Sequence, residues 1–496
     1  MSSTESVQAD PRRWKALGVL GLIQFMLVLD ITVVNVALPH IRDDLGFSQS
    51  GLAWVVDGYV LMAGGLLLLG GRLADILGRR KVFLLGVAIF AIASATCGAA
   101  VNPGMLVASR FLQGAGEAFA APASLGLIAL LFPDPQERIK ALGLWGGIAG
   151  LGGTSGTVIS GALVNYVSWR WIFYINLPVA VFALLVVPRL VSESRMVRDS
   201  HRPDFAGAIT GTAGLIALVD GLLQAARHPW GSTNVLVPLV LGGALLVAML
   251  LIEARSDAPL IPLSFFENRT RMVTNFTTLF FASGFFSYFF LLTLYEQQIL
   301  HYSAIKSGLS YLPFGITIGM GIGIGTAIMP KVGVRNLLAF SFFLCAFGLY
   351  LTSTIDITTD YWTGIMPGMA VLGLGSGLSF PTIGNASLHE VTGQDSALAS
   401  GVQATFQQVG GALGLSVLVT IASRHASSQM AHGVNGAIAT IHGYARAYHV
   451  GVALLAAGGV FVLALMEKNV LATPATRRPG PPPRRSSRSR PERIAA

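Results

Sequence analysis

Long apolar runs separated by short polar segments recur along almost the whole chain. Each run is close to the roughly 20 residues that an α-helix needs to cross a bilayer. The pattern predicts fourteen transmembrane helices, and therefore an all-α polytopic membrane protein. The first eight are expected near residues 16–38, 52–72, 82–100, 105–131, 140–163, 170–188, 205–224 and 234–252. The remaining six are expected near 272–294, 307–329, 336–355, 361–385, 397–422 and 447–466.

The composition agrees with a membrane protein and excludes several other classes. The 496 residues have a mean hydropathy of +0.65, and 11% are charged, against roughly 25% in soluble domains. The two cysteines, Cys97 and Cys345, lie midway along apolar runs, and the nine histidines are scattered, so neither a disulfide nor a metal site is expected. No phosphate-binding loop with a lysine is present. We therefore expect neither an enzyme nor an ATP-driven pump, and no bound cofactor.

The basic residues fall mainly on one side of the predicted topology. Of the 33 Lys and Arg residues, 26 lie in the two termini and the alternate loops on their side, six lie on the opposite side, and Arg110 lies within a helix. Basic residues concentrate on the cytoplasmic side of membrane proteins. This predicts a multi-pass protein of the cell membrane with both termini in the cytoplasm. The first apolar run is too long for a signal peptide and contains Asp30, so we interpret it as a retained helix.

An internal repeat divides the chain into two similar halves. Gly114, Gly116 and Pro122 recur at a constant offset as Gly373, Gly375 and Pro381. The repeat pairs helices 2 to 5 with helices 10 to 13, so two six-helix halves flank an extra pair of helices. The predicted organisation is a cytoplasmic N-terminus (1–15), an N-terminal half (16–190), accessory helices 7 and 8 (191–255), a C-terminal half (256–467) and an Arg/Pro-rich tail (468–496). The tail is expected to be disordered and to touch lipid headgroups rather than nucleic acid.

The segment between the second and third apolar runs carries a family resemblance. Its sequence, Gly71-Arg72-Leu73-Ala74-Asp75-Ile76-Leu77-Gly78-Arg79-Arg80-Lys81, resembles the signature loop of the major facilitator superfamily of secondary transporters. In that family the loop is cytoplasmic and latches the two halves together. The resemblance implies the major facilitator fold, with a substrate site near the midplane between the halves. It also implies a conformational latch formed by Gly71, Asp75, Gly78, Arg79 and Arg80.

Three further stretches resemble one branch of this superfamily, the fourteen-helix drug:proton antiporters. They are Leu29–Pro39 in helix 1, Trp169–Pro178 at the start of helix 6, and Ala399–Gly414 in the second half. The resemblance implies export of amphipathic toxic compounds such as drugs or antibiotics, driven by the proton-motive force. The expected partners are a small-molecule substrate, protons and membrane lipid, and the expected state is a monomer.

Helix 5 is rich in glycine but departs from the antiporter pattern. Gly152, Gly156 and Gly161 resemble the antiporter motif, in which a Gly-Pro pair kinks the fifth helix. Here Thr157 stands at the position of the proline, and Ser160 replaces a glycine. This departure leaves one alternative open, proton-coupled uptake of a specific solute. A second alternative, from another class, is a membrane sensor that transports nothing.

Charged residues inside apolar runs are candidates for the transport chemistry, because each costs about 2.5–3.5 kcal/mol at a helix centre on insertion scales. Arg110 belongs to Arg110-Phe111-Leu112-Gln113-Gly114-x-Gly116, which resembles a family signature whose arginine takes part in proton transfer. Glu117 lies two turns further along the same face. We predict that Asp30, Arg110 and Glu117 couple protons. The alternative for Glu117, and the favoured interpretation of Asp220 in helix 7, is a structural role.

A second group of residues is predicted to bind substrate. Asp57 lies near the outer end of helix 2, where water is expected to reach it and where its charge would favour cationic substrates. The remaining members of this group are Asn35, Gln113 and Glu296.

Overall fold

The computed structural model describes residues 12–132, 134–193, 204–256, 259–391 and 396–468, and these contain helices but no strands. The predicted all-α fold is confirmed. The first six spans are α1 (Arg13–Leu45), α2 (Gln49–Leu77), α3 (Arg79–Gly98), α4 (Pro103–Leu131), α5 (Pro135–Tyr166), and α6 (Trp171–Tyr174) with α7 (Asn176–Leu190). The next two are α8 (Phe205–Gln224) and α9 (Thr233–Glu253).

The second half of the chain begins with a 3-10 turn, η1 (Leu263–Glu267), and contains six further spans. They are α10 (Arg269–Gln298), α11 (Ala304–Ser310) with α12 (Leu312–Val332), α13 (Val334–Thr352), the π-helical turn η2 (Tyr361–Ile365) with α14 (Met366–Ser387), α15 (Ser396–Ala431) and α16 (Gly436–Leu465). Thirteen spans in the described residues are long and apolar enough to cross a membrane. The other is α5, which has 32 residues but carries many glycine, serine and threonine residues.

Helix ends follow local capping chemistry. The Asn102 side chain accepts the N–H of Met105 at 2.8 Å at the start of α4, and the Asp134 side chain accepts the N–H of Glu137 at 2.9 Å at the start of α5. Each cap precedes a proline, which needs no hydrogen bond at the first helical position. α1 and α16 extend well beyond their predicted apolar runs. The helical conformation continues through the polar residues at these ends, which an apolar pattern does not reveal.

Glycines set equivalent helix contacts in the two halves. The backbone of α4 at Gly114 lies against α2 and at Gly116 against α3. In the second half, Gly373 lies against α12 and Gly375 against α13 in the same manner. Small residues allow transmembrane helices to approach this closely. The repeat in the sequence is therefore a repeat in packing.

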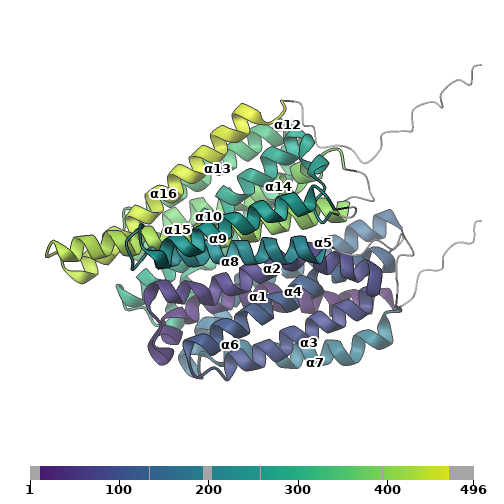
Figure 1. The fold of residues 1–496 in the computed structure, drawn as a ribbon, viewed down its shortest axis with the longest axis horizontal. Coiled ribbons are helices and arrows are strands. Elements are labelled where there is room, and N and C mark those ends of the chain that lie inside the picture. Colours follow the sequence, from purple (N-terminus) through teal and green to yellow (C-terminus); the bar gives the residue numbers. More distant parts are fainter. Residues whose placement is uncertain (1–11, 133, 194–203, 257–258, 392–395, 469–496) are drawn as a thin grey trace, which may run out of the picture.

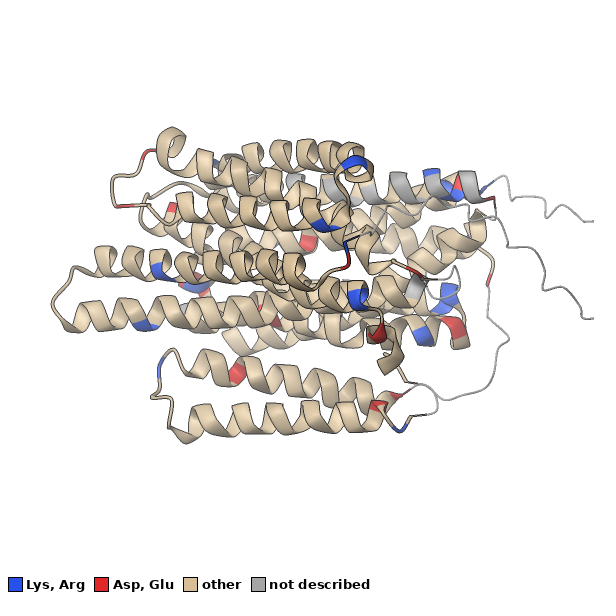
Figure 2. Ribbon diagram, turned by 90° about the horizontal axis from the view of Figure 1, so that it is seen from above, with Lys and Arg blue, Asp and Glu red and all other residues tan. Residues whose placement is uncertain are grey.

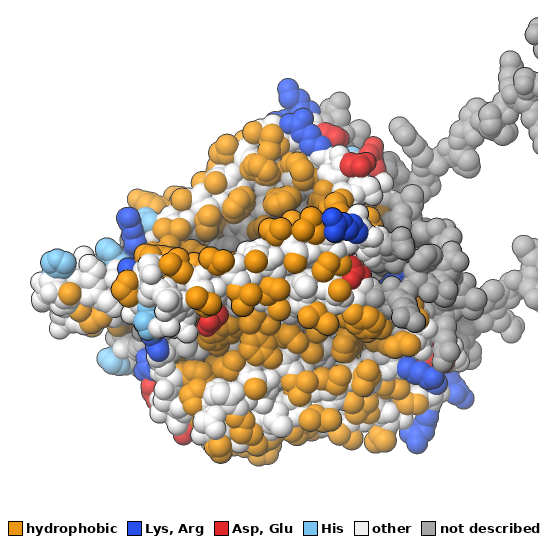
Figure 3. All heavy atoms as spheres, viewed as in Figure 1, with side chains coloured by type: hydrophobic (Ala, Val, Ile, Leu, Met, Phe, Trp, Pro, Cys, Tyr) orange, Lys and Arg blue, Asp and Glu red, His pale blue; other side chains and the backbone are white. Residues whose placement is uncertain are grey.

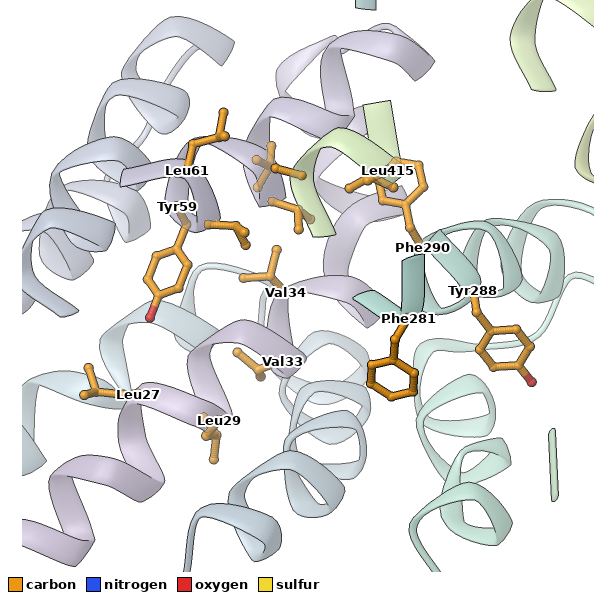
Figure 4. Close-up of a cluster of buried hydrophobic side chains, with 14 of the residues drawn as sticks. Leu27, Leu29, Val33, Val34, Tyr59, Leu61, Phe281, Tyr288, Phe290 and Leu415 are labelled. Atoms are coloured by element: carbon orange, nitrogen blue, oxygen red, sulfur yellow. The ribbon is translucent and has the colours of Figure 1, made fainter. Parts of the chain in front are cut away.

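The two halves meet mainly along two pairs of helices, α2 with α15 and α5 with α11. In Figure 1 the N-terminal helices (purple and blue) and the C-terminal helices (green and yellow) form two neighbouring bundles. Figure 4 shows buried side chains from both halves, with Leu29 of α1 and Tyr59 of α2 from the first and Phe281 of α10 and Leu415 of α15 from the second. α8 packs against both α2 and α15, while α9 packs mainly on α8. The α8–α9 hairpin therefore lies along one seam between the halves (Figure 1), and the view from above shows it at one edge of the bundle (Figure 2).

The molecule has a polar region at each end and an apolar band between them. On the face in Figure 3, hydrophobic side chains cover the middle, and most charged side chains lie towards the two ends. Both chain ends leave the bundle at the same end (Figure 1), which we call the terminal side, and the other end is the opposite side. The bundle therefore has the surface of a membrane-embedded protein.

Candidate functional site

A fully buried carboxylate with three donors lies at the centre of the first half. Asp30 in α1 has no exposed surface. Its Oδ2 accepts a hydrogen bond from Arg110 Nη1 at 2.5 Å, and its Oδ1 accepts from Gln113 Nε2 and Asn176 Nδ2, both at 2.8 Å. α4 supplies two of these partners and α7 supplies the third. The site therefore joins three helices of one half.

Arg110 also contacts two further helices, α2 and α6. Its Nη1 also donates to Gln113 Oε1 at 2.7 Å, and its Nε donates to the carbonyl of Val55 in α2 at 2.8 Å. The guanidinium carbon lies 4.3 Å from the ring centroid of Tyr59 and 5.8 Å from that of Phe173. Aromatic faces attract cations, and the attraction is stronger in a site without water. The arginine is thus stabilised as a cation by a carboxylate, carbonyls and rings.

The stability of the Asp30–Arg110 ion pair depends on the charge of both partners. Two opposite buried charges offset one another, but removing one of them leaves an uncompensated charge that costs about 3–5 kcal/mol. A proton on Asp30 has this consequence, because it neutralises the carboxylate and leaves Arg110 without its counter-ion. Loss of the charge on Asp30 would therefore destabilise this arrangement of α1 and α4.

Two polar residues that sequence reasoning missed complete this network. Asn176 Nδ2 also donates to Ser94 Oγ at 3.0 Å, and Ser94 Oγ in turn donates to the carbonyl of Phe173 at 2.8 Å. Gln113 Nε2 lies 3.3 Å from the same serine oxygen. Neither residue is charged, and their helices lie far from Asp30 in the chain. Only the position of Asn176 within the Trp169–Pro178 stretch could have drawn attention to it.

Glu117 lies in the same electrostatic neighbourhood but outside the network. It is almost fully buried in α4, and its Oε2 has no hydrogen-bond partner among the described residues. Its charge interacts with Asp30 and Arg110, and the Tyr59 phenol lies beside it. The structure thus brings the three predicted proton-coupling residues together. Their role in coupling stays a prediction.

Asp57 differs from its expected environment. The expectation that water reaches it is wrong for this structure, because Asp57 has no exposed surface. α2 begins at Gln49, about two turns earlier, and this helix packs against α4, α8 and α15. Neither Asp57 oxygen has a hydrogen-bond partner among the described residues. An ionised carboxylate there would be an uncompensated charge, which burial strongly disfavours.

The other residues predicted to bind substrate occupy three different environments. Asn35 is partly exposed on α1, and its Nδ2 lies 3.4 Å from the carbonyl of Ile31. Gln113 is a buried partner of Asp30. Glu296, near the end of α10, is fully buried and accepts hydrogen bonds from Ser307 and Ser310. The four residues do not form one cluster here, and their binding of substrate stays a prediction.

The predicted latch residues bond within the first half in this structure. Asp75 Oδ1 accepts from Arg79 Nε at 3.0 Å and from Nη2 at 2.9 Å, and Arg79 Nη1 donates to the carbonyl of Gly126 in α4 at 3.0 Å. Gly78 has φ = 114°, a conformation that favours glycine, at the turn between α2 and α3. Gly71 lies beside Pro122 of α4. The loop therefore ties α2, α3 and α4 together.

Glu193, which follows α7, is a second acid at this loop that the sequence did not reveal. Its Oε1 accepts the N–H of Arg80 at 3.1 Å, and its Oε2 accepts the N–H of Lys81 at 3.2 Å. A carboxylate at the first N–H groups of a helix is favourable, because these groups lack partners within the helix and carry a positive partial charge. Arg80 Nη1 donates to the carbonyl of Val191 at 3.0 Å. These bonds attach the loop to α7.

The glycines of α5 allow close contact with other helices. Gly152 and Gly156 lie against α1, and Gly161 lies against the backbone of Ala304 in α11. Ser160 Oγ donates to the carbonyl of Val33 in α1 at 2.5 Å. α5 is helical throughout, including Thr157 at the position of the family's proline.

Comparison with known proteins identifies the family. The sequence profile described as Major Facilitator Superfamily matches residues 20–415. The chain belongs to the major facilitator superfamily. Membership makes it a transporter rather than an enzyme, and its helices make it a multi-pass membrane protein.

Several relatives within the superfamily are similar along most of their length. The chain is 39% identical to the puromycin resistance protein pur8 of Streptomyces alboniger, covering 92% of each chain. It is 35% identical to a lincomycin resistance protein of Streptomyces lincolnensis, covering 82% of this chain and 84% of the relative. It is 36% identical to the cephamycin export protein CmcT of Amycolatopsis lactamdurans, covering 80% and 82%.

Solved structures of the superfamily share the fold at low sequence identity. A bacterial homologue of the human lysosomal transporter Spinster, in an inward-facing and unoccupied conformation, superposes with a TM-score of 0.65 at 16% identity and covers 92% of this chain and 97% of its own. A transporter of the POT family in complex with a conjugated peptide gives 0.67 at 16% identity, covering 91% and 96%. The predicted major facilitator fold is thereby confirmed.

Proposed function

We propose that the protein exports amphipathic drugs or antibiotics across the cell membrane in exchange for protons. The substrate class rests on the relatives, which are named for resistance to puromycin and lincomycin and for export of cephamycin. The coupling to protons rests on the buried Asp30–Arg110 pair, which is the observation that carries the mechanism. The protein acts without a cofactor, and its partners are the substrate, protons and lipid.

The coupling works through the charge on Asp30. When ionised, Asp30 holds Arg110, Gln113 and Asn176 in the arrangement described here. When a proton neutralises it, Arg110 loses its counter-ion, and the helices relax towards another conformation. Glu117 beside Tyr59 provides a second place for the proton on the same helix. Each half-cycle then moves protons in one direction and substrate in the other.

The available driving force is sufficient for strong export. One pH unit contributes about 1.4 kcal/mol per proton, and 100 mV contributes about 2.3 kcal/mol. Together, with one proton exchanged for one neutral substrate molecule, about 3.7 kcal/mol corresponds to a concentration ratio of several hundredfold.

We place the terminal side in the cytoplasm, because 26 of the 33 Lys and Arg residues lie there in the predicted topology. In this orientation the α5–α11 contact closes the outer side. Gln297 Nε2 of α10 also donates to the carbonyl of Val36 in α1 at 2.8 Å, which is a second bond between the halves on that side. Reporter fusions after residues 45, 230 and 360 should read outside, and fusions after 80, 135, 200 and 470 should read inside. A C-terminal fusion that reads outside would refute the orientation.

Flux into everted vesicles tests the function. Acidification of the vesicle lumen should drive a candidate antibiotic inward, and Asp30→Asn should abolish this flux for neutral and cationic compounds alike. The matched control is Asp43→Asn, which removes an exposed acid at the outer end of α1. Substrate movement in the same direction as protons would indicate a symporter, and no flux with any compound would indicate a sensor.

A further inference from the structure

The C-terminal half contains a buried acid that the Asp30 mechanism does not use. Glu296 has no exposed surface and lies two residues before the end of α10, on the opposite side of the bundle. Ser307 Oγ donates to its Oε2 at 2.6 Å, and Ser310 Oγ donates to its Oε1 at 2.7 Å. Both serines belong to α11, so this single side chain fastens α11 to α10.

The same short helix forms the contact between the halves. A side chain on Gly308 of α11 would collide with the carbonyl of Thr157 in α5, and one on Gly161 of α5 would collide with the backbone of Ala304. The two helices therefore touch through their backbones. One face of α11 rests on α5 of the other half, while Ser307 and Ser310 bind Glu296. Separation of the halves on this side must move α11 away from α5.

No cation in the described part of the chain forms an ion pair with Glu296. Among the described residues, the titratable groups that interact with it are Lys306 and six tyrosines, which are Tyr288, Tyr295, Tyr302, Tyr311, Tyr361 and Tyr448. Lys306 Nζ lies 3.6 Å from the ring centroid of Tyr302 and makes no ion pair with the acid. Tyrosine phenols are ordinarily neutral below pH 9. The contrast with Asp30, which binds a guanidinium directly, is complete.

We propose that Glu296 is a second proton-binding site, and that the halves close on the outer side only after it has taken a proton from that side. A fully buried carboxylate without an ion-paired cation is costly when ionised, because two neutral hydroxyl donors do not replace its hydration. When the acid is neutral, a serine hydroxyl can accept a hydrogen bond from it, since Ser310 Oγ can donate to the carbonyl of Ser307 instead. When α11 leaves α5, the end of α10 opens to outside water, where the ionised form is solvated. Closure then buries Glu296 behind the α5–α11 contact as a neutral acid bonded to Ser307 and Ser310. This proposal rests on the proposed orientation and exchange cycle, in which it controls the return to the inward-facing state.

The closing step requires only the uptake of one proton. On closure, the carboxylate accepts one proton from outside water, and no other bond is formed or broken. Because the closed state binds this proton more tightly than the open state, acid must favour closure. For one linked proton, the ratio of closed to open molecules changes by up to about tenfold per pH unit.

Distances between spin labels on the full-length protein in nanodiscs test the proposal without substrate or flux. Labels at Val101→Cys and Ile357→Cys lie in exposed loops of the two halves on the opposite side, whereas the native Cys97 and Cys345 are buried. Between pH 5 and pH 9, the wild type should shift towards the short distance as the pH falls. Glu296→Gln should stay closed at high pH. Its ratio of closed to open molecules should depend less on pH than that of the wild type, by up to about tenfold per pH unit.

Two further variants separate a proton site from a structural contact. Asp43→Asn, which removes an exposed acid on the same side, should behave as wild type. The double variant Ser307→Ala/Ser310→Ala should populate the closed state less than the wild type at every pH. It should keep the pH dependence of the wild type, because Glu296 is still present. An unchanged pH dependence in Glu296→Gln would overturn the proposal. If the wild-type protein exports no compound in flux assays, the proposed function is refuted. The pH dependence of the spin-label distances would still test the role of Glu296.

Discussion

Asn176 at the start of α7 lies 2.8 Å from the carboxylate of Asp30 in α1, although 146 residues separate them in the chain. The bond places an uncharged amide beside the acid that is proposed to carry the proton. An amide donor stabilises the ionised form of a carboxylate more than the neutral form. Asn176 is therefore a positioning residue that helps to hold the Asp30 carboxylate beside Arg110.

Replacement of Asn176 by alanine should slow proton-driven transport by roughly twofold to tenfold. Asp30 keeps Arg110 and Gln113 but loses one of its three donors, a hydrogen bond worth about 0.5–1.5 kcal/mol. The measurement is proton-driven flux in reconstituted vesicles. Ser94→Ala leaves the bond between Asn176 and Asp30 in place, so it should slow transport less. An unchanged rate in Asn176→Ala would mean that this bond does not contribute to the transport cycle.

Asp57→Asn should leave stability nearly unchanged and alter selectivity. The side chain is fully buried without a partner, so loss of the acid removes no hydrogen bond of this conformation. In the outward-facing state, a negative charge 4 Å from a cationic substrate would contribute about 1–4 kcal/mol, depending on the effective dielectric. Flux of a matched neutral and cationic pair measures the effect. Export of the cation should fall while the neutral compound is spared, and an equal loss of both would contradict this division.

Asp75→Asn should slow transport about fivefold without preventing substrate binding. The carboxylate anchors Arg79, and through Arg79 the loop binds the carbonyl of Gly126. A change in this bond shifts the balance between conformations by on the order of 1 kcal/mol. Equilibrium binding and initial transport rates distinguish the two effects. Glu193→Gln should act in the same direction, because the N–H groups of Arg80 and Lys81 lose a charged acceptor. Loss of binding in Asp75→Asn would place the residue in the substrate site.

Gly308→Ala should open the α5–α11 contact. The added methyl group would meet the carbonyl of Thr157, and overpacking of this kind costs about 1–3 kcal/mol. The ratio of closed to open molecules should fall by roughly fivefold to 150-fold, as measured by the same label pair at Val101 and Ile357. Gly319→Ala is the matched control, because nothing lies within 4 Å of the added atom in α12. If both variants give the same distances, the contact does not limit opening.

Hydrophobic patterning located thirteen of the spans directly, because a span needs a long apolar stretch to be stable in lipid. The predicted fifth span is also helical, although α5 carries many glycine, serine and threonine residues. The pattern could not locate the ends of α1 and α16, which continue through polar residues and are fixed by Gly46 in a left-handed cap and by the Asn435 side chain. Caps of this kind depend on a few backbone groups. An apolar run of the required length carries no record of them.

The candidate site was predictable where a charge lies inside an apolar run. Asp30 and Arg110 were found in this way, and the structure brings them into contact. Asn176 and Ser94 were missed, because neutral polar residues are common in membrane helices and their partners lie on other helices. The burial of Asp57 was missed for a related reason, since a helix sequence does not show which neighbours cover it. In the sequence Glu193 resembles an ordinary loop acid. Only the structure shows that its carboxylate binds the first N–H groups of α3.

The hairpin of α8 and α9 makes the two flanks of the protein different. One seam between the halves is covered by α8, which touches both α2 and α15, whereas the seam at α5 has no accessory helix. A compound that enters from the bilayer would therefore reach the junction of the halves from the α5 flank and not from the α8 flank. For such a compound, both partitioning into the lipid and molecular shape would affect export.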